Sequence, residues 1–159
     1  MSTKAKNENC GCAATEEVQD CRPATKRAIV VNDQLLSMPG RYVKVAAIKE
    51  QANIPPDHVL IRDHNSPHDV IMPENGTADL AEGTVFYSMP ACEVKPRPAC
   101  DAPAKRVVDV DDRWEVVTKP NQTGREIRDL YGLPENVELL KDFKSPNDEV
   151  IDDKTTVNL

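Results

Sequence analysis

Apolar and polar residues follow the same order of patterns in two parts of the chain. Each part opens with a β-branched run, 28–31 or 107–110, that ends at a polar turn signal. A second extended segment then leads into a stretch with apolar residues at spacings near 3.6, which predicts a helix. The predicted elements of the first part are strand, strand, helix, strand, short strand and strand, at 28–31, 35–43, 45–52, 59–61, 70–71 and 83–87.

The two parts are copies of one sequence. With a shift of 79 positions, 26–80 aligns with 105–159 without a gap over 55 residues. A register of this length is hard to obtain by chance, and such a repeat indicates a repeated structural unit. We therefore predict two small α+β domains, in each of which one helix packs across a sheet. Identical pairs along the alignment include Arg27/Arg106, Val31/Val110, Pro55/Pro134, Leu60/Leu139 and Leu80/Leu159.

Composition sets the boundaries of these domains. Residues 1–25 are rich in Lys, Glu, Asn and Ala and contain almost no large apolar side chains, which predicts a disordered tail. Residues 91–104 contain three prolines and no periodicity, which predicts an extended, Pro-rich linker. The first unit is therefore 26–90 and the second unit is 105–159.

Capping signals are clearest at the helix of the second unit. Thr123 precedes the helical stretch and Glu126 follows three residues later, which is the capping-box pattern. Gly132 stands where a helix C-terminal glycine belongs, and Pro134 then stops the helix. The sequence thus predicts a helix that begins just after Thr123 and ends before Gly132.

The second unit ends without a counterpart of the β-rich run 83–87 that closes the first unit. A sheet without its last strand would expose backbone hydrogen-bonding groups and part of its core. Three explanations stay open at this point. The chain is truncated relative to its gene product, or a neighbouring molecule adds the strand, or the N-terminal tail fills the groove.

Several segments together resemble the bacterial multiubiquitin repeat. They are 123–127 (TGREI) with 131–133 (YGL) in the second unit, and TADL (77–80) with VFY (85–87) in the first. In the first unit KVAAI takes the place of TGREI. The resemblance covers 27–90 and 106–159, and it implies two tandem ubiquitin-like β-grasp domains, the second lacking its last strand.

The resemblance also implies a function. Members of this family are similar in role to ubiquitin and are typically encoded beside an activating enzyme, a conjugating enzyme and a deconjugating peptidase. Some such systems act in antiphage defence. The expected role is therefore a modifier that is attached to target proteins.

The C-terminal sequence departs from the pattern of ubiquitin-like modifiers. These are usually activated at a C-terminal glycine, which fits narrow enzyme channels, whereas this sequence ends at Leu159 with no glycine nearby. Leu159 is the conjugation terminus only if the chain is not truncated. The alternative function is a non-conjugated scaffold, a homo-oligomer that assembles by β-strand exchange through open sheet edges.

One position in each unit is a candidate contact for partner proteins. Leu60 and Leu139 are identical between the units, and neighbouring residues of a strand point to opposite faces. If these leucines face the helix, Ile61 and Leu140 face outward. In ubiquitin-like proteins the equivalent exposed apolar position is the main docking surface. The alternative is an inverted alternation, with Ile61 and Leu140 in the core.

Charge and apolar content narrow the classes of partner and compartment. The formal net charge of −7 argues against nonspecific binding to nucleic acid or to anionic membranes. No apolar run approaches the roughly 20 residues that a membrane span needs. With no export signal, the five cysteines are expected in a reducing, cytoplasmic compartment.

The sequence offers no pattern for catalysis or for metal binding. The cysteine spacings do not match a zinc module, so free thiols are expected. The histidines of the first unit have no histidine counterparts in the second, and we expect them at the surface. Trp114 is expected to pack rather than to bind a ligand. We therefore predict no enzyme, no cofactor and no metal; the residues weighed were Cys10, Cys12, Cys21, Cys92, Cys100, His58, His64 and His68.

Overall fold

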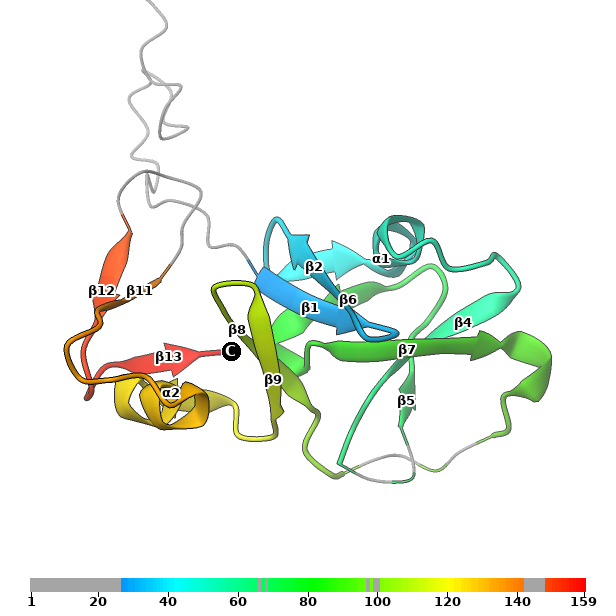
Figure 1. Cartoon of the computed structure of the whole chain (residues 1–159). Coiled ribbons are helices and arrows are strands. Elements are labelled where there is room, and N and C mark those ends of the chain that lie inside the picture. The colour runs from blue at the N-terminus through cyan, green and yellow to red at the C-terminus, as the bar shows by residue number, and fades with distance from the viewer. Residues whose placement is uncertain (1–26, 66, 68, 97, 99–100, 142–147) are drawn as a thin grey trace, which may run out of the picture.

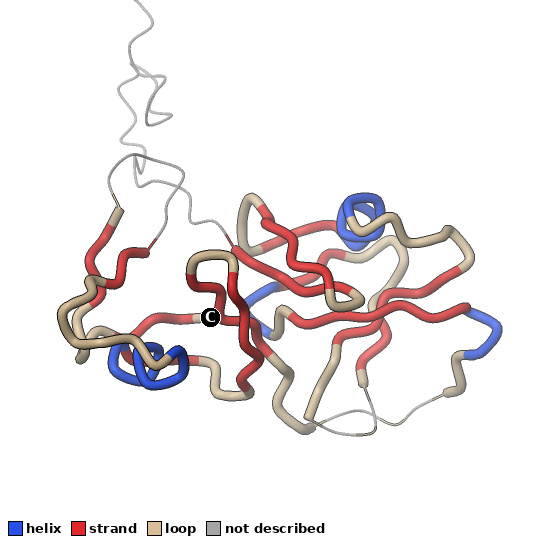
Figure 2. Tube along the Cα trace, viewed as in Figure 1, coloured by secondary structure: helices blue, strands red, loops and turns tan. Residues whose placement is uncertain are grey.

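The computed structural model describes residues 27–65, 67, 69–96, 98, 101–141 and 148–159. The predicted tail 1–25 lies outside the described residues, as do four of the five cysteines and His68. Within the described residues the chain has a mixed α+β fold with two α-helices (Figure 1). Figure 2 shows these helices well apart from each other, one in each unit.

The first unit contains seven strands and one α-helix. Two short 3-10 helices, η2 (Leu80–Glu82) and η3 (Ala91–Glu93), flank its last strand. Its strands and helix are β1 (Arg27–Val31), β2 (Gln34–Met38), β3 (Tyr42–Lys44), α1 (Val45–Gln51), β4 (His58–Arg62), β5 (Val70–Ile71), β6 (Thr77–Asp79) and β7 (Val85–Pro90).

The main sheet of the first unit has five strands in the order β2-β1-β7-β4-β5. β1 and β7 are parallel at its centre, and all other neighbours are antiparallel. β3 and β6 form a separate two-stranded pair. The order is not sequential, because the last strand lies between the first strand and β4.

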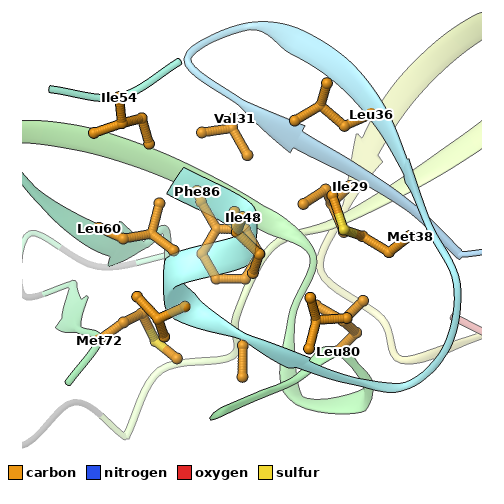
Figure 3. Close-up of a cluster of buried hydrophobic side chains, with 13 residues drawn as sticks. Ile29, Val31, Leu36, Met38, Ile48, Ile54, Leu60, Met72, Leu80 and Phe86 are labelled. Atoms are coloured by element: carbon orange, nitrogen blue, oxygen red, sulfur yellow. The ribbon is translucent and has the colours of Figure 1, made fainter. Parts of the chain in front are cut away.

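A hydrophobic core lies between this sheet and α1. Figure 3 shows Phe86 of β7 close to Ile48 of the helix, with Leu60 of β4 beside them. All three are at most 2% exposed. The helical periodicity predicted this arrangement, since Val45 and Ile48 turn to one face of α1. The buried members of this first core are Ile29, Val31, Leu36, Met38, Val43, Val45, Ile48, Ile54, Leu60, Met72, Ala78, Leu80 and Phe86.

The second unit repeats the order of the elements from β1 to β6 with six strands of its own. They form three two-stranded pairs, β8-β9, β10-β13 and β11-β12. Its elements are β8 (Arg106–Val110), β9 (Arg113–Val117), β10 (Asn121–Thr123), α2 (Gly124–Tyr131), β11 (Leu139–Lys141), β12 (Glu149–Ile151) and β13 (Thr156–Asn158).

Both units open with the predicted tight hairpin. Asn32 and Asp33 join β1 to β2, and Asp111 and Asp112 join β8 to β9. All four residues have positive φ, between 49° and 63°. Two-residue hairpin loops of this conformation favour Asn and Asp, which tolerate the left-handed region better than other non-glycine residues. The polar residues at these positions therefore predicted both turns correctly.

The caps of α2 confirm the prediction from sequence. The Thr123 hydroxyl accepts a hydrogen bond from the Glu126 N–H (3.2 Å), and the Glu126 carboxylate accepts one from the Thr123 N–H (2.8 Å). Gly132 follows in the left-handed conformation at φ 62°. The N-cap of α1, Lys44, makes no side-chain cap. The two helices are therefore stabilised differently despite their shared origin.

The two units pack directly against each other. The N–H of Val107 on β8 donates to the hydroxyl of Thr84 (2.8 Å), and the Thr84 N–H donates to the carbonyl of Lys105 (3.1 Å). Val30 and Val85 meet Val107 in a small apolar cluster, against which Trp114 also packs. Trp114 thus has the packing role that was expected.

The linker that was predicted to be extended begins with the 3-10 helix η3, and its end lies against the first unit. The Asn65 N–H donates to the Pro103 carbonyl (2.9 Å), and His64 forms a β-bridge with Ala104. Next in the chain, the Lys105 ammonium lies 3.0 Å from the Asp63 carboxylate. The end of the linker is therefore tied to the residues that follow β4.

Candidate protein-binding surface

The β11-β12 hairpin of the second unit presents an exposed apolar pair. Leu140 and Val150 are direct cross-strand partners, and they are 54% and 50% exposed. Their neighbour Leu139 is only 6% exposed and joins the second core. The outward orientation predicted for Leu140 is therefore confirmed. We call Leu140 and Val150 the hairpin pair.

The structure contradicts the exposure predicted for Ile61, which is fully buried at 0% exposed. The alternation itself was right, because Leu60 belongs to the core under α1 and Ile61 does not. Ile61 stands opposite Tyr87 of β7, whose hydroxyl donates to the Asp69 carboxylate (2.6 Å). Direct cross-strand neighbours share one face of a sheet. In the first unit β7 therefore lies beside Ile61, whereas β11 in the second unit pairs with β12 alone among the described strands.

Val150 is a surface residue that the sequence analysis did not single out. It aligns with Ile71 in the repeat, and Ile71 pairs with Ile61 as Val150 pairs with Leu140. The signal was thus present: two conservative apolar pairs of the alignment are cross-strand partners in both units. The local sequence pattern does not show which strands pair. Only the pairing of β11 with β12 brings Leu140 and Val150 together on one surface.

A groove of about 790 Å³ opens between β8 and β11. It is lined by residues 107–112 on one side and 137–141 on the other, and residues 35–37 of β2 border it as well. Figure 1 shows β11 and β12 standing apart from β8 and β9. Its apolar lining includes Val108, Ile127, Leu133, Leu139, Ile151, Val157 and Leu159.

Carboxylates border this groove along β8. Asp109, Asp111 and Asp112 are all exposed. Partial burial, together with the carboxylates of Asp112 and Asp111, raises the pKa of Asp109. Glu138 adds a further exposed carboxylate on the β11 side. The groove therefore combines an apolar floor with an acidic rim.

Tyr131 closes one side of the second core. Its hydroxyl donates to the carbonyl of Val108 and lies 3.1 Å from the carbonyl of Arg113. Burial, and then the nearby carboxylates of Glu115 and Asp109, raise the pKa of this phenol to about 12. Tyr131 therefore holds α2 to the β8-β9 hairpin as a neutral donor.

Leu159 is not a free residue in this fold. Its side chain is half-buried and packs against the second core, and its N–H donates to the Pro120 carbonyl (3.0 Å). Leu80, its counterpart, likewise donates to the Arg41 carbonyl (2.9 Å). A role of Leu159 in attachment stays an expectation from the resemblance.

The described histidines do not form a site. His64 is only 9% exposed, so the expectation of a surface residue was wrong for it. Its Nδ1 lies 2.8 Å from the Ala102 carbonyl, because the linker lies over it. His58 is half-buried. Cys92 is exposed with a free thiol, and no group of three metal-ligating side chains occurs among the residues that the structure describes.

Comparison with known proteins gives no relative: no protein-family model, no curated protein and no solved structure matches this chain. Within the described ranges, no helix has the length and apolar character needed to cross a membrane. The features that the geometry offers for function are the hairpin pair and the acidic-rimmed groove, and both suit the binding of protein segments.

Proposed function

We propose that this chain is a ubiquitin-like protein modifier built from two tandem β-grasp domains. The observation that carries the proposal is the sheet of the first unit, in which the first and last strands are parallel neighbours and α1 packs across one face. This strand order is the arrangement expected of a β-grasp domain. The gapless repeat extends the same interpretation to the second unit.

In this proposal the chain acts in a cytoplasmic conjugation system of the bacterial ubiquitin-like kind, and the proposed setting is antiphage defence. Its partners are an activating-type enzyme, a conjugating-type enzyme, a deconjugating peptidase and the target proteins. The chain itself performs no catalysis. The resemblance described above supports these roles, together with a fold that presents binding surfaces.

The hairpin pair is the proposed docking surface for these enzymes. Leu140 stands at the position that the resemblance assigns to partner contact, and Val150 lies beside it on the same face. Apolar side chains that are half exposed lose water when a partner covers them, and this favours association. Ile61 is excluded from this role because it is buried.

The test is co-expression of the chain with the enzymes encoded beside its gene, followed by mass spectrometry. A covalent adduct on a target protein is expected with the unaltered chain. Leu140→Glu places a charge in the docking surface, and we expect the adduct yield to fall about tenfold, as when a contact worth about 1.4 kcal/mol is lost.

The matched control is Leu130→Glu, which places the same charge on α2 at a leucine that is 38% exposed. It is expected to leave the adduct yield unchanged. No adduct with the unaltered chain would contradict the modifier proposal. Equal yields from the two variants would contradict only the assignment of the hairpin pair.

A second candidate function is the self-assembling scaffold. The observation that favours it is that β8 pairs with β9 alone and β11 with β12 alone among the described strands. Open edges of this kind accept strands from other molecules. Light scattering that gives the mass of a monomer over a range of concentrations would reject this candidate.

A further inference from the structure

The β3-β6 pair of the first unit turns one face outward. Tyr42 stands directly opposite Asp79, and Lys44 stands directly opposite Thr77. Direct cross-strand neighbours share one face of a sheet, so these four side chains lie together. Tyr42, Lys44 and Thr77 are exposed, whereas the middle residue of each strand is buried in the first core. We call this outward side of the pair the ribbon face.

Tyr42 is the most exposed large apolar side chain among the residues that the structure describes, at 66%. The Arg41 guanidinium lies over its ring, 4.9 Å from the ring centroid. Arg41 is itself held by two hydrogen bonds to the Asp79 carboxylate. The stacked guanidinium restricts the ring before any partner arrives, which lowers the entropy cost of binding. Tyrosine and arginine are also enriched among the side chains that carry most of the binding energy in protein interfaces.

Lys44 stands at a position where a lysine does not help the fold. It is the N-cap residue of α1, and its side chain makes no cap. The first turn of α1 contains no acidic residue, and a cation near a helix N-terminus is unfavourable. In the second unit the same position is Thr123, which forms the capping box with Glu126. The first unit thus lacks helix stabilisation that the second has, and such a local conflict is expected where a residue serves binding.

The aromatic ring and the two cations are specific to the first unit. The β10-β13 pair takes the same place in the second unit, with the same register of cross-strand partners. Its outward residues are all uncharged. The fold therefore requires neither an aromatic residue nor a cation on this face. The repeat counterparts of Arg41, Tyr42 and Lys44 are Pro120, Asn121 and Thr123.

The charges of the ribbon face show which partner chemistry fits. The carboxylate of Asp79 offsets the charge of Arg41, and the nearby carboxylate of Glu82 is paired with Arg62. Lys44 is exposed and has no ion-pair partner within the described part of the chain. The face therefore attracts carboxylates, although the chain as a whole has a formal net charge of −7. That overall charge repels nucleic acid and also a second copy of the chain.

We propose that the ribbon face binds an acidic segment of a partner protein. The Tyr42 ring contacts apolar parts of that segment, and the Lys44 ammonium pairs with one of its carboxylates. Arg41 acts as a positioning residue that holds the ring. The ribbon face belongs to the first unit and the hairpin pair to the second, so this binding does not depend on whether the chain becomes attached to targets.

The experiment selects peptides from a phage-displayed library of short random sequences, with the full chain as bait. Peptides that also bind the double variant Tyr42→Asn with Lys44→Thr are discarded, because this variant carries the residues of the second unit at these two positions. We expect the retained peptides to be rich in Asp and Glu and to bind the unaltered chain saturably in calorimetry. Their affinity should weaken as salt is added.

Single variants separate the two side chains. Tyr42→Asn is expected to weaken the binding of a retained peptide about tenfold, because it removes the apolar contact. Lys44→Thr is expected to weaken it about threefold and to reduce its dependence on salt. The matched control, Lys95→Thr, removes an exposed lysine of the linker and is expected to bind normally. Circular dichroism checks that all three variants are folded.

Lys44→Thr also has a readout in stability. The backbone at this position is extended, with φ −65° and ψ 137°. A threonine there is expected to accept a hydrogen bond from the Ala47 N–H, as Thr123 accepts one from Glu126. The midpoint of urea unfolding should therefore rise while the affinity for the peptide falls. A higher midpoint with unchanged affinity would contradict the role of Lys44 in binding.

Three further outcomes would overturn the proposal. The first is a selection in which no peptide distinguishes the unaltered chain from the double variant. The second is a set of retained peptides without a surplus of acidic residues, since charge would then not select the partner. The third is an oligomer in light scattering that the double variant does not form, since a second copy of the chain would then be the occupant.

Discussion

At the scale of single residues, the Arg41–Asp79 ion pair links the loop before β3 to β6. The guanidinium donates two hydrogen bonds to the carboxylate, at 2.7 and 2.6 Å. The Asp79 carboxylate also accepts a hydrogen bond from the Ala81 N–H (3.0 Å) and so caps η2. The hydrogen bond from Arg41 is the main reason that the pKa of Asp79 is lowered from 3.8.

This shift predicts a dependence of stability on acid. A carboxyl whose pKa is lower in the folded state stabilises the fold above its ordinary pKa, and this stabilisation is lost as the pH falls through 3.8 and below. Asp79→Asn should therefore lose less stability on acidification than the unaltered chain. The difference should stay below about 1 kcal/mol because the pair is partly exposed. Urea unfolding between about pH 6 and about pH 2 measures it.

The control for this prediction is Asp57→Asn. Asp57 is exposed, and its side chain makes no hydrogen bond within the described part of the chain. The Asp57→Asn variant should lose as much stability on acidification as the unaltered chain does. If Asp79→Asn gives the same curve as Asp57→Asn, the Arg41 pair does not contribute to acid sensitivity.

At the same scale, the sequence predicted the direction of side chains better than their exposure. Leu139 and Leu140 point as the alternation required. Ile61 also has the predicted orientation, yet it is buried because Tyr87 lies next to it on a strand 26 positions later. Exposure depends on which distant segment covers a face, and a local pattern carries no information about that.

At the scale of elements, the strand and helix order followed from the hydrophobic pattern. The helices, the hairpin turns and the caps of α2 were all predicted, because each depends on residues close in sequence. The segment 35–43, predicted as one strand, is divided into β2 and β3. Pro39 and Gly40 lie in the break, where proline removes a backbone donor and glycine weakens a strand. The pairing of β3 with β6 was not predicted, since it joins distant residues.

Gly124, the first residue of α2, gives a prediction about element packing. A Cβ at this position would lie 2.1 Å from the carbonyl oxygen of Asp152, and the Gly124 N–H donates to the Thr155 carbonyl (3.0 Å). Gly124→Ala should therefore push α2 away from the segment before β13. We expect a loss of about 1–3 kcal/mol in the free energy of unfolding, measured by urea denaturation.

Gly40→Ala is the matched control, since a Cβ there would meet no atom within 4 Å. It should change the free energy of unfolding by less than about 0.5 kcal/mol. Equal losses from the two variants would show that α2 moves away without cost. The first unit has the large Val45 at the position of Gly124, so the need for glycine arises only from the packing of the second unit.

At the scale of the whole molecule, Thr84 and Arg106 hold the units together. Thr84 is 3% exposed, and its hydroxyl satisfies the Val107 N–H. The buried guanidinium of Arg106 donates to the carbonyls of Ala81 (2.7 Å) and Ala104 (3.2 Å). Burial, and then the nearby Arg62, lower the pKa of Arg106. Buried polar groups of the two units are therefore hydrogen-bonded to each other at this junction.

Thr84→Val tests this junction. Valine keeps the shape of threonine but leaves the buried Val107 N–H without an acceptor, which should cost about 1–3 kcal/mol. Hydrogen exchange of the Val107 amide should become faster, whereas the amide of Leu60 in the first core should change less. The control is Thr77→Val, at an exposed position of β6. Equal effects of the two variants would show that the Thr84 hydroxyl does not couple the units.

The junction also has a consequence for how the gene can change. Thr84 lies in the first unit, and its partners Lys105 and Val107 lie in the second. A recombination event within the codons for 91–104 would combine two units that had not been selected to fit each other. The buried Val107 N–H would then lose the Thr84 hydroxyl as its acceptor. The duplication suggests that the two repeats are interchangeable. Because of the junction, we expect the two units to be inherited together.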